Sequence, residues 1–133
     1  IANPALRAAG LRVSCDVGVP VSRLAEMFAG IERVAEQHSR RVSVVAHAGD
    51  GNTHPLIVYD ASDPAMTVRA HKAFGDIMDL AVGLGGTITG EHGVGRLKKP
   101  WLAGQLGPEA MELNRRIKVA LDPEGILNPG AVI

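Results

Sequence analysis

The sequence has little that marks a secreted, membrane-spanning or nucleic-acid-binding protein. It contains a single cysteine, Cys15, so no disulfide can form within the chain, which favours a reducing, cytosolic compartment. Fourteen Lys and Arg residues balance fourteen Asp and Glu residues, which excludes the broad basic surface typical of nucleic-acid binding. No apolar run approaches the roughly 18 residues that indicate a transmembrane helix.

Aromatic residues are also scarce, at 3% of the chain, whereas glycine is abundant, at 16 of 133 residues. Hydrophobic residues still make up 46% of the sequence, which is enough to bury a core, and the length suits one domain. The sequence opens at Ile1 without the pattern of a signal peptide. We therefore expect residues 1–133 to be one domain of a longer protein, whose function belongs to the whole.

The hydropathy pattern predicts alternating strands and helices, followed by one more helix. Ser22 and Asp63-Pro64 have the composition of helix starts. The expected strands are 12–19, 41–47, 54–59 and 87–89, and the expected helices are 22–35, 64–83 and 108–121. The order before the last helix is βαββαβ, which predicts an α+β, ferredoxin-like antiparallel sheet with both helices on one face. The last helix forms a C-terminal helical segment.

Two histidines bracket the turn between the second and third predicted strands. His47 and His54 are expected to face each other across the mouth of a hairpin. Two imidazoles at such a separation can share one divalent metal, and Glu91 could add an oxygen ligand while leaving positions open for a substrate. The alternative from spacing alone is that both histidines are polar residues beside a loop.

The glycines from Gly90 to Gly95 match neither of the common nucleotide-binding loops. The phosphate-binding loop requires Gly-Lys-Ser/Thr, whereas Arg96-Leu97 follows here. The dinucleotide fingerprint has its glycines in the opposite order and opens a helix, and no clear helix follows this run. The sequence therefore contains no dinucleotide fingerprint.

Three motifs occur together in this chain: His-Ala-Gly-Asp-Gly-Asn-Thr-His at 47–54, Gly-Glu-His-Gly-Val-Gly at 90–95 and Leu-Asn-Pro-Gly at 127–130. In order and spacing they resemble the C-terminal cap domain of FAD-linked oxidases of the D-2-hydroxyacid type. The resemblance extends from Asp16 to the end of the chain. In that family an N-terminal domain carries FAD and the cap closes over the flavin ring. The resemblance therefore implies a cap whose N-terminal FAD-binding domain is absent from this chain.

The resemblance also implies roles for individual residues. His47, His54 and Glu91 match a divalent metal site, with zinc or manganese as the expected ion. His92 matches the catalytic histidine, and Asn128 matches an asparagine that lies near the flavin. FAD itself would be bound mainly by the missing domain. Asn52 is assigned to the geometry of the turn or to support of the ligands.

The implied reaction is oxidation of a small D-2-hydroxy acid by hydride transfer to FAD. The hydroxyglutarate-using branch resembles this chain but has a lysine and an asparagine where Ser14 and Leu56 stand. Without that cation and amide, a second substrate carboxylate is not favoured, so glycolate or D-lactate is the expected substrate. The chain alone should be colourless and inactive, because no part of it can enclose a flavin.

The expected partners follow from the same resemblance. They are the FAD domain of the same polypeptide, the hydroxy acid, and an electron acceptor of unknown identity that could place a cytoplasmic protein at the inner membrane. An exposed apolar patch on the sheet is one route to a homo-oligomer. No nucleic-acid partner is expected.

Two other classes of function stay open at this point. One is a freestanding metal-dependent hydrolase that uses the same histidines, and the other is a non-catalytic, ferredoxin-like interaction module. The topology itself raises an objection to a shared site. In a strict ferredoxin-like sheet the last strand ends far from the hairpin mouth, so Glu91 and His92 would lie far from His47 and His54. They could meet only if that strand stops early or the sheet is larger.

Overall fold

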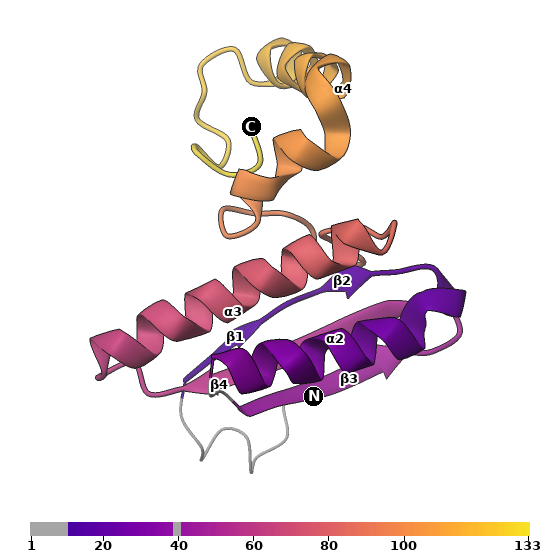
Figure 1. Cartoon of the computed structure of the whole chain (residues 1–133). Helices are drawn as coiled ribbons and strands as arrows, with labels where there is room; N and C mark the ends of the chain where they lie inside the picture. Colours follow the sequence, from indigo (N-terminus) through magenta and orange to yellow (C-terminus); the bar gives the residue numbers. More distant parts are fainter. Residues whose placement is uncertain (1–10, 39–40) are drawn as a thin grey trace. The chain divides into compact units, whose positions relative to one another are not determined.

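The computed structural model describes residues 11–38 and 41–133 and divides into two compact units, of which the first ends at Glu91 (Figure 1). The second unit comprises residues 92–133. The first unit alternates strands and helices in the predicted order. Its elements are β1 (Leu11–Ser14), β2 (Val17–Gly18), the short 3₁₀ helix η1 (Val21–Arg23), α2 (Leu24–Gln37), β3 (Arg41–His47), β4 (Asn52–Tyr59) and α3 (Pro64–Gly83).

The sheet of the first unit is antiparallel and has β4 at its centre. β3 pairs with one side of β4, and β1 and β2 pair end to end with the other side. Beyond β2, Thr87 forms a single antiparallel bridge with Gly18. This strand order is that of the predicted βαββαβ arrangement, and the α+β class is confirmed. The predicted strand 87–89 is wrong in extent, since only the bridge at Thr87 forms.

The first predicted strand, 12–19, is also interrupted, because a proline lies opposite its middle. The N–H of Cys15 donates to the carbonyl of Pro55 at 2.9 Å, but Pro55 has no N–H to return. The hydroxyl of Ser14 donates to the Cys15 carbonyl instead, at 3.1 Å. The ladder is therefore broken at Cys15 and Asp16, which separate β1 from β2.

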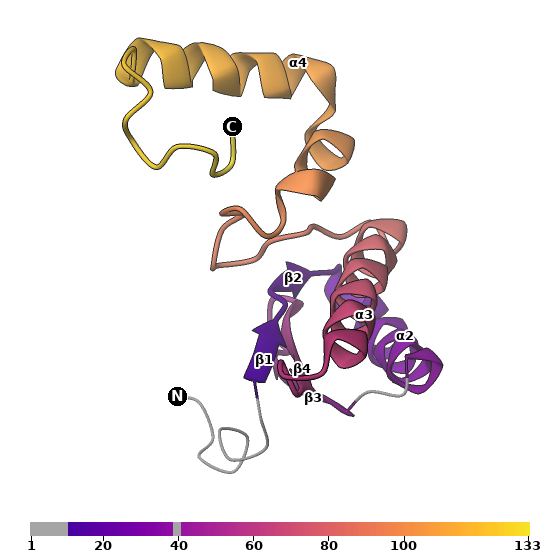
Figure 2. The ribbon, with the colours of Figure 1, turned by 90° about the vertical axis from the view of Figure 1, so that its left-hand side faces the viewer.

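Both helices of the first unit pack on the same face of the sheet (Figure 2). Because side chains alternate along a strand, Thr53, Pro55 and Ile57 of β4 point toward the helices, and all three are buried. The largest buried side chains of the helices that meet them are Met27, Phe74, Ile77 and Met78. The intervening residues Asn52, His54 and Leu56 therefore lie on the opposite face, which no helix in the described part of this unit covers.

The two predicted helix starts have different outcomes. Asp63 caps α3 as predicted, since its carboxylate accepts the N–H groups of Ala65 and Met66 at 2.8 and 3.1 Å. The predicted cap at Ser22 is wrong. Ser22 lies inside η1, and α2 begins after Arg23 with no side-chain cap.

The second unit contains α4 (Lys99–Leu121) and the C-terminal tail. Gly107 has a φ of 75° and interrupts α4 immediately before Pro108, so the predicted helix 108–121 matches its second half. The half before Gly107 was not expected. None of the helices in the described residues combines the length and apolar character needed to cross a membrane.

The turn between β3 and β4 depends on Gly51, whose φ is 86°. A Cβ at this position would lie 2.0 Å from the carbonyl oxygen of Val19, whose N–H donates to the Gly51 carbonyl at 3.0 Å. Gly51→Ala is therefore expected to lower the free energy of unfolding by at least about 1–3 kcal/mol, the usual range for a strained backbone. Chemical denaturation would measure this. Gly49→Ala is the matched control in the same turn, because its Cβ would meet nothing within 4 Å; equal losses in both variants would contradict the prediction.

Candidate functional site

His47 and His54 lie on the open face of the sheet, at the end of the β3–β4 hairpin. His47 pairs with Asn52, and His54 pairs with Val45, so the two histidines are diagonal neighbours. The predicted direct pairing is wrong, because the turn of residues 48–51 sets the register so that Asn52 is opposite His47. The rings still meet, with centroids 5.3 Å apart and planes at 89°.

Glu91 completes a three-residue cluster with these histidines. Its Oε1 lies 3.1 Å from Nε2 of His54 and 3.6 Å from Nε2 of His47. One ligand atom from each residue lies within 4.8 Å of the other two. The side chain of His54 is 12% exposed, whereas those of His47 and Glu91 are each 54% exposed. His54 is therefore the buried member of the cluster, whereas His47 and Glu91 are open to solvent.

Glu91 reaches the histidines because the last strand ends early. Thr87 exchanges two backbone hydrogen bonds with Gly18, at 2.8 and 3.1 Å. If that ladder continued, Glu91 would lie opposite Ser14, away from the hairpin mouth. Instead the N–H groups of Gly90 and Glu91 donate to the carboxyl group of Asp16, at 3.0 and 3.2 Å. The chain leaves the sheet there, which answers the topological objection to a site shared by His47, His54 and Glu91.

Asp16 is the site residue that sequence reasoning missed. Its side chain is 1% exposed, and one of its oxygens lies 3.7 Å from Nδ1 of His54. The other oxygen accepts the hydroxyl of Thr89 at 3.2 Å. A signal was present in the sequence, since an acidic residue stands between the apolar residues Cys15 and Val17 in a predicted strand. A carboxylate in such a position needs several donors.

Asn52 packs against the backbone that carries Glu91. A Cβ on Gly90 would lie 2.4 Å from Oδ1 of Asn52, so only glycine fits there without displacing the amide. The N–H of Asn52 donates to Oδ1 of Asp50 at 2.9 Å. Asn52 is 8% exposed, and no donor among the described residues reaches its Oδ1. Asn52 thus contributes to the geometry of the turn, and its amide also contacts Gly90.

The cluster of His47, His54 and Glu91 has the chemistry of a divalent metal site. Two imidazole nitrogens and one carboxylate oxygen form the donor set of many open zinc sites. Ligand atoms around a tetrahedral zinc lie about 3.4 Å from one another, given metal–ligand distances of about 2.0–2.1 Å. The separations of 3.1 and 3.6 Å bracket that value. The residues present therefore fit a bound metal with positions left for a substrate.

The other two predicted site residues, His92 and Asn128, belong to the second unit. His92 is its first residue and is exposed. Asn128 has a φ of 47°, and its carbonyl accepts the N–H of Ala131 at 3.2 Å. Asn128 is therefore the first residue of a turn in the tail, and asparagine tolerates such a backbone better than most residues.

The tail that carries Asn128 is anchored by Asp122. The carboxylate of Asp122 accepts the N–H groups of Ile126 and Leu127 at 2.9 and 3.1 Å. It also accepts a hydrogen bond from the ammonium group of Lys118. The same ammonium group donates to the carbonyl of Leu127 at 2.6 Å. The hydrogen bond from Lys118 lowers the pKa of Asp122 below its usual value, against the opposing effect of desolvation. The contribution of Asp122 to the stability of the fold is therefore fully present above the usual pKa of an aspartate. It is lost as the pH falls through the lowered pKa of Asp122.

Comparison with known proteins places these motifs in a family. Residues 1–132 match the family described as FAD linked oxidases, C-terminal domain. The chain belongs to this family. The match spans nearly the whole sequence, as the resemblance of the three motifs predicted.

Relatives of this FAD-linked oxidase domain include two bacterial glycolate oxidase subunits named GlcD. The chain is 43% identical to that of Escherichia coli K12 over 115 residues, which is 86% of this chain and 23% of the relative. The GlcD subunit of Bacillus subtilis is 42% identical over 86% of this chain and 24% of its own length. A mitochondrial D-lactate dehydrogenase [cytochrome] of Arabidopsis thaliana is 42% identical over 89% of the chain and 21% of the relative. The chain thus spans about a quarter of the length of these relatives.

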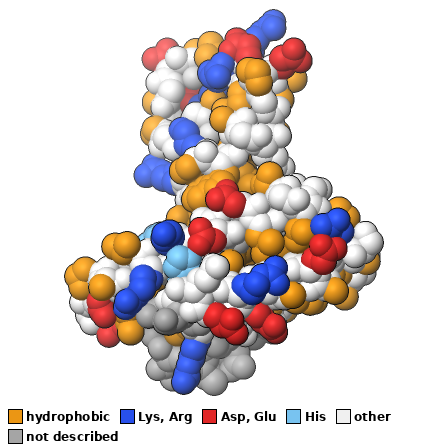
Figure 3. All heavy atoms as spheres, in the orientation of Figure 1, with side chains coloured by type: hydrophobic (Ala, Val, Ile, Leu, Met, Phe, Trp, Pro, Cys, Tyr) orange, Lys and Arg blue, Asp and Glu red, His pale blue; other side chains and the backbone are white. Residues whose placement is uncertain are grey.

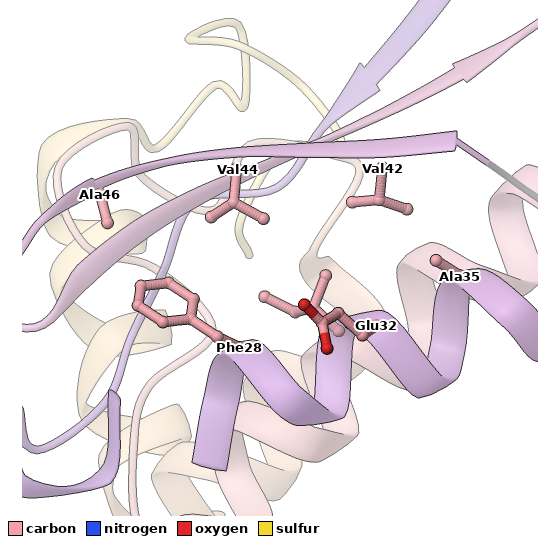
Figure 4. A pocket seen from close by; sticks show the side chains of 7 residues that line it. Phe28, Glu32, Ala35, Val42, Val44 and Ala46 are labelled. Carbon is pink, nitrogen blue, oxygen red and sulfur yellow. The ribbon is translucent and has the colours of Figure 1, made fainter. Parts of the chain in front are cut away.

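The first unit of this FAD-linked oxidase domain also has a groove, which Figure 4 shows from close by. It has a volume of about 430 Å³ and runs between α2 and β3. Phe28 on α2 faces Val44 and Ala46 on β3 across it. These β3 residues alternate with His47 and therefore lie on the helix-covered face. The groove and the histidine cluster are consequently on opposite faces of the sheet.

Charged side chains are mixed on the face of the first unit shown in Figure 3. Lys and Arg alternate there with Asp and Glu, without a continuous patch of one sign. This distribution agrees with the zero net charge of the sequence.

Proposed function

We propose that this chain is the cap domain, residues 1–133, of a flavin-dependent oxidoreductase that oxidises a small D-2-hydroxy acid, and that its FAD domain belongs to the same polypeptide. The observation that carries the proposal is the convergence of His47, His54 and Glu91 on the open sheet face of an FAD-linked oxidase domain. The distance of 3.1 Å between Glu91 and His54 does not favour an interaction module, for which the cluster would have no reason to converge.

The residues of the chain divide the reaction between them. His47, His54 and Glu91 would hold the divalent metal, with zinc or manganese as the expected ion. When bound, that metal would supply Lewis-acid stabilisation of negative charge on the substrate oxygens. His92 would accept the proton of the substrate hydroxyl, and the flavin of the FAD domain, when bound, would supply the hydride acceptor for C2, so that the hydroxy acid becomes an oxo acid. Asn128 would lie near the flavin.

Glycolate or D-lactate is the substrate that the site favours. Ser14 and Leu56 form a direct cross-strand pair on the open face, and the next pair of residues on that face is Asp16 and His54. In the hydroxyglutarate-using branch, a lysine and an asparagine occupy the positions of Ser14 and Leu56. A serine and a leucine offer no cation for a second carboxylate beside His54. The glycolate oxidase and D-lactate dehydrogenase names of the relatives agree with this choice.

Anaerobic mixing of the full-length protein with candidate substrates tests the proposed function. Glycolate or D-lactate should bleach the visible absorbance of the flavin, and D-2-hydroxyglutarate should do so much more slowly. The isolated chain should be colourless and should oxidise none of them. If no hydroxy acid reduces the flavin, or if the isolated chain binds FAD and is active, the proposal is wrong. The electron acceptor, and with it any association with the inner membrane or with a second copy, stays a prediction.

A further inference from the structure

We propose that Asp16 is a positioning residue that assembles the histidine–glutamate cluster, an inference that rests on the proposed metal site. Asp16 touches neither substrate nor flavin in this role. Its carboxyl group sets the place of the Glu91 backbone and the orientation of the His54 ring. The three ligand atoms converge because one buried group acts on both sides of the cluster.

The first contribution of Asp16 is to redirect the chain that carries Glu91. Both carboxyl oxygens accept hydrogen bonds: Oδ2 from Gly90 N at 3.0 Å and from Thr89 Oγ1 at 3.2 Å, and Oδ1 from Glu91 N at 3.2 Å. These bonds replace the sheet ladder that would have continued from Thr87. The N–H groups of Gly90 and Glu91 donate to the side chain of Asp16 instead of to the backbone of a neighbouring strand, so the chain turns toward His54.

The second contribution is to the ring of His54. Asp16 and His54 occupy opposite positions on the two strands, between the pairs Ser14–Leu56 and Gly18–Asn52. The ring presents Nε2 to Glu91 at 3.1 Å and Nδ1 toward Oδ1 of Asp16 at 3.7 Å, a separation at which the carboxylate acts on the ring through its charge and not through a hydrogen bond. A carboxylate beside one ring nitrogen favours the proton on that nitrogen and leaves the lone pair on the other. Nε2 is thereby prepared as the metal ligand.

Burial strengthens the interactions of Asp16 with both the Glu91 backbone and the His54 ring. Asp16 is 1% exposed and the His54 side chain 12% exposed, so water competes little for these groups. Replacing Asp16 by asparagine keeps the size of the side chain but exchanges one acceptor for an NH₂ donor. That donor would face the N–H of Gly90 or Glu91, since both oxygens now accept. Asp16→Asn is therefore a local change with a specific consequence for the Glu91 backbone.

The test combines two measurements on the full-length protein. In the metal-free protein, amide exchange at Gly90 and Glu91 should be about tenfold faster or more in Asp16→Asn, because bonds to a carboxylate are stronger than neutral ones. In titrations with Mn²⁺ or Co²⁺ alone, the dissociation constant should rise about 10–100-fold, as found for outer partners of metal-binding histidines. The visible spectrum of bound Co²⁺ should also change, which a general loss of stability would not produce.

Two further variants make the result specific. Asp76→Asn is the matched control, because Asp76 contacts His38 at 2.5 Å in the same unit but on the helix side; it should leave the Co²⁺ spectrum and affinity unchanged. Thr89→Val removes one donor to Asp16 and should weaken metal binding in the same direction by a smaller factor. Thr89→Val replaces Asp16→Asn in the test if Asp16→Asn does not fold.

Each outcome has a distinct meaning. Wild-type exchange rates at Gly90 and Glu91 in Asp16→Asn, or unchanged metal affinity in both Asp16→Asn and Thr89→Val, would overturn the positioning role. An equal loss of metal affinity in Asp76→Asn would overturn it too, since any damage to the unit would then suffice. If the wild type binds neither ion, the proposed metal site fails, while the exchange measurement still decides whether Asp16 holds the Glu91 backbone.

Discussion

Replacing His92 with alanine is expected to slow reduction of the flavin by glycolate or D-lactate about 10²–10⁴-fold, the usual loss when a general base is removed. In the proposed reaction, the substrate hydroxyl loses its proton as the hydride leaves C2. His92 is the residue proposed to accept that proton. The FAD content should stay at the wild-type level, because His92 is an exposed residue at the start of the second unit.

Stopped-flow mixing under anaerobic conditions measures this effect directly, since it follows the flavin before any electron acceptor reacts. His71→Ala is the matched control: His71 is an exposed histidine on α3 whose ring contacts Tyr59, with centroids 6.3 Å apart. It should reduce its flavin at the wild-type rate. If His92→Ala does so as well, the proton goes elsewhere and His92 has no part in the chemical step.

Loss of His54 should have the largest effect on metal binding. His54→Ala removes the least exposed of the three proposed ligands and leaves His47, at 3.6 Å from Glu91, as the remaining histidine of the cluster. We expect the dissociation constant for Zn²⁺ or Mn²⁺ to rise by more than the about 10–100-fold typical of an outer partner. Flavin reduction should fall in parallel, because stabilisation of charge on the substrate oxygens is lost with the metal.

Elemental analysis after gel filtration provides the measurement. The wild-type protein should retain one divalent ion per chain, and His54→Ala should retain less than about a tenth of an equivalent. His71→Ala is the control for the loss of a histidine in the same unit, because His71 lies on α3 and is not part of the cluster; it should retain the metal. A fully active wild-type protein without a transition metal would contradict the assignment of all three ligands.

Local sequence patterns were sufficient for much of the fold. Alternating apolar residues predicted β3 over its whole length, and Asp63-Pro64 predicted the start of α3, because strand periodicity and helix capping involve only near neighbours. The same holds for the choice of His47 and His54 as candidates, since both flank one short turn. The family was predictable from three motifs in order, and the match over residues 1–132 agrees with it.

Only the tertiary structure decided how the candidate site is put together. The register of the hairpin makes His47 and His54 diagonal neighbours, and Pro55 interrupts the strand opposite it, which no local pattern in 12–19 indicated. Glu91 meets the histidines because its N–H binds Asp16, a residue 75 positions earlier in the chain. The sequence by itself predicted which residues are candidate metal ligands and which face of the hairpin the two histidines occupy. Their convergence required a hydrogen bond between distant segments, and the short-range periodicity of strands and helices contains no information about such a bond.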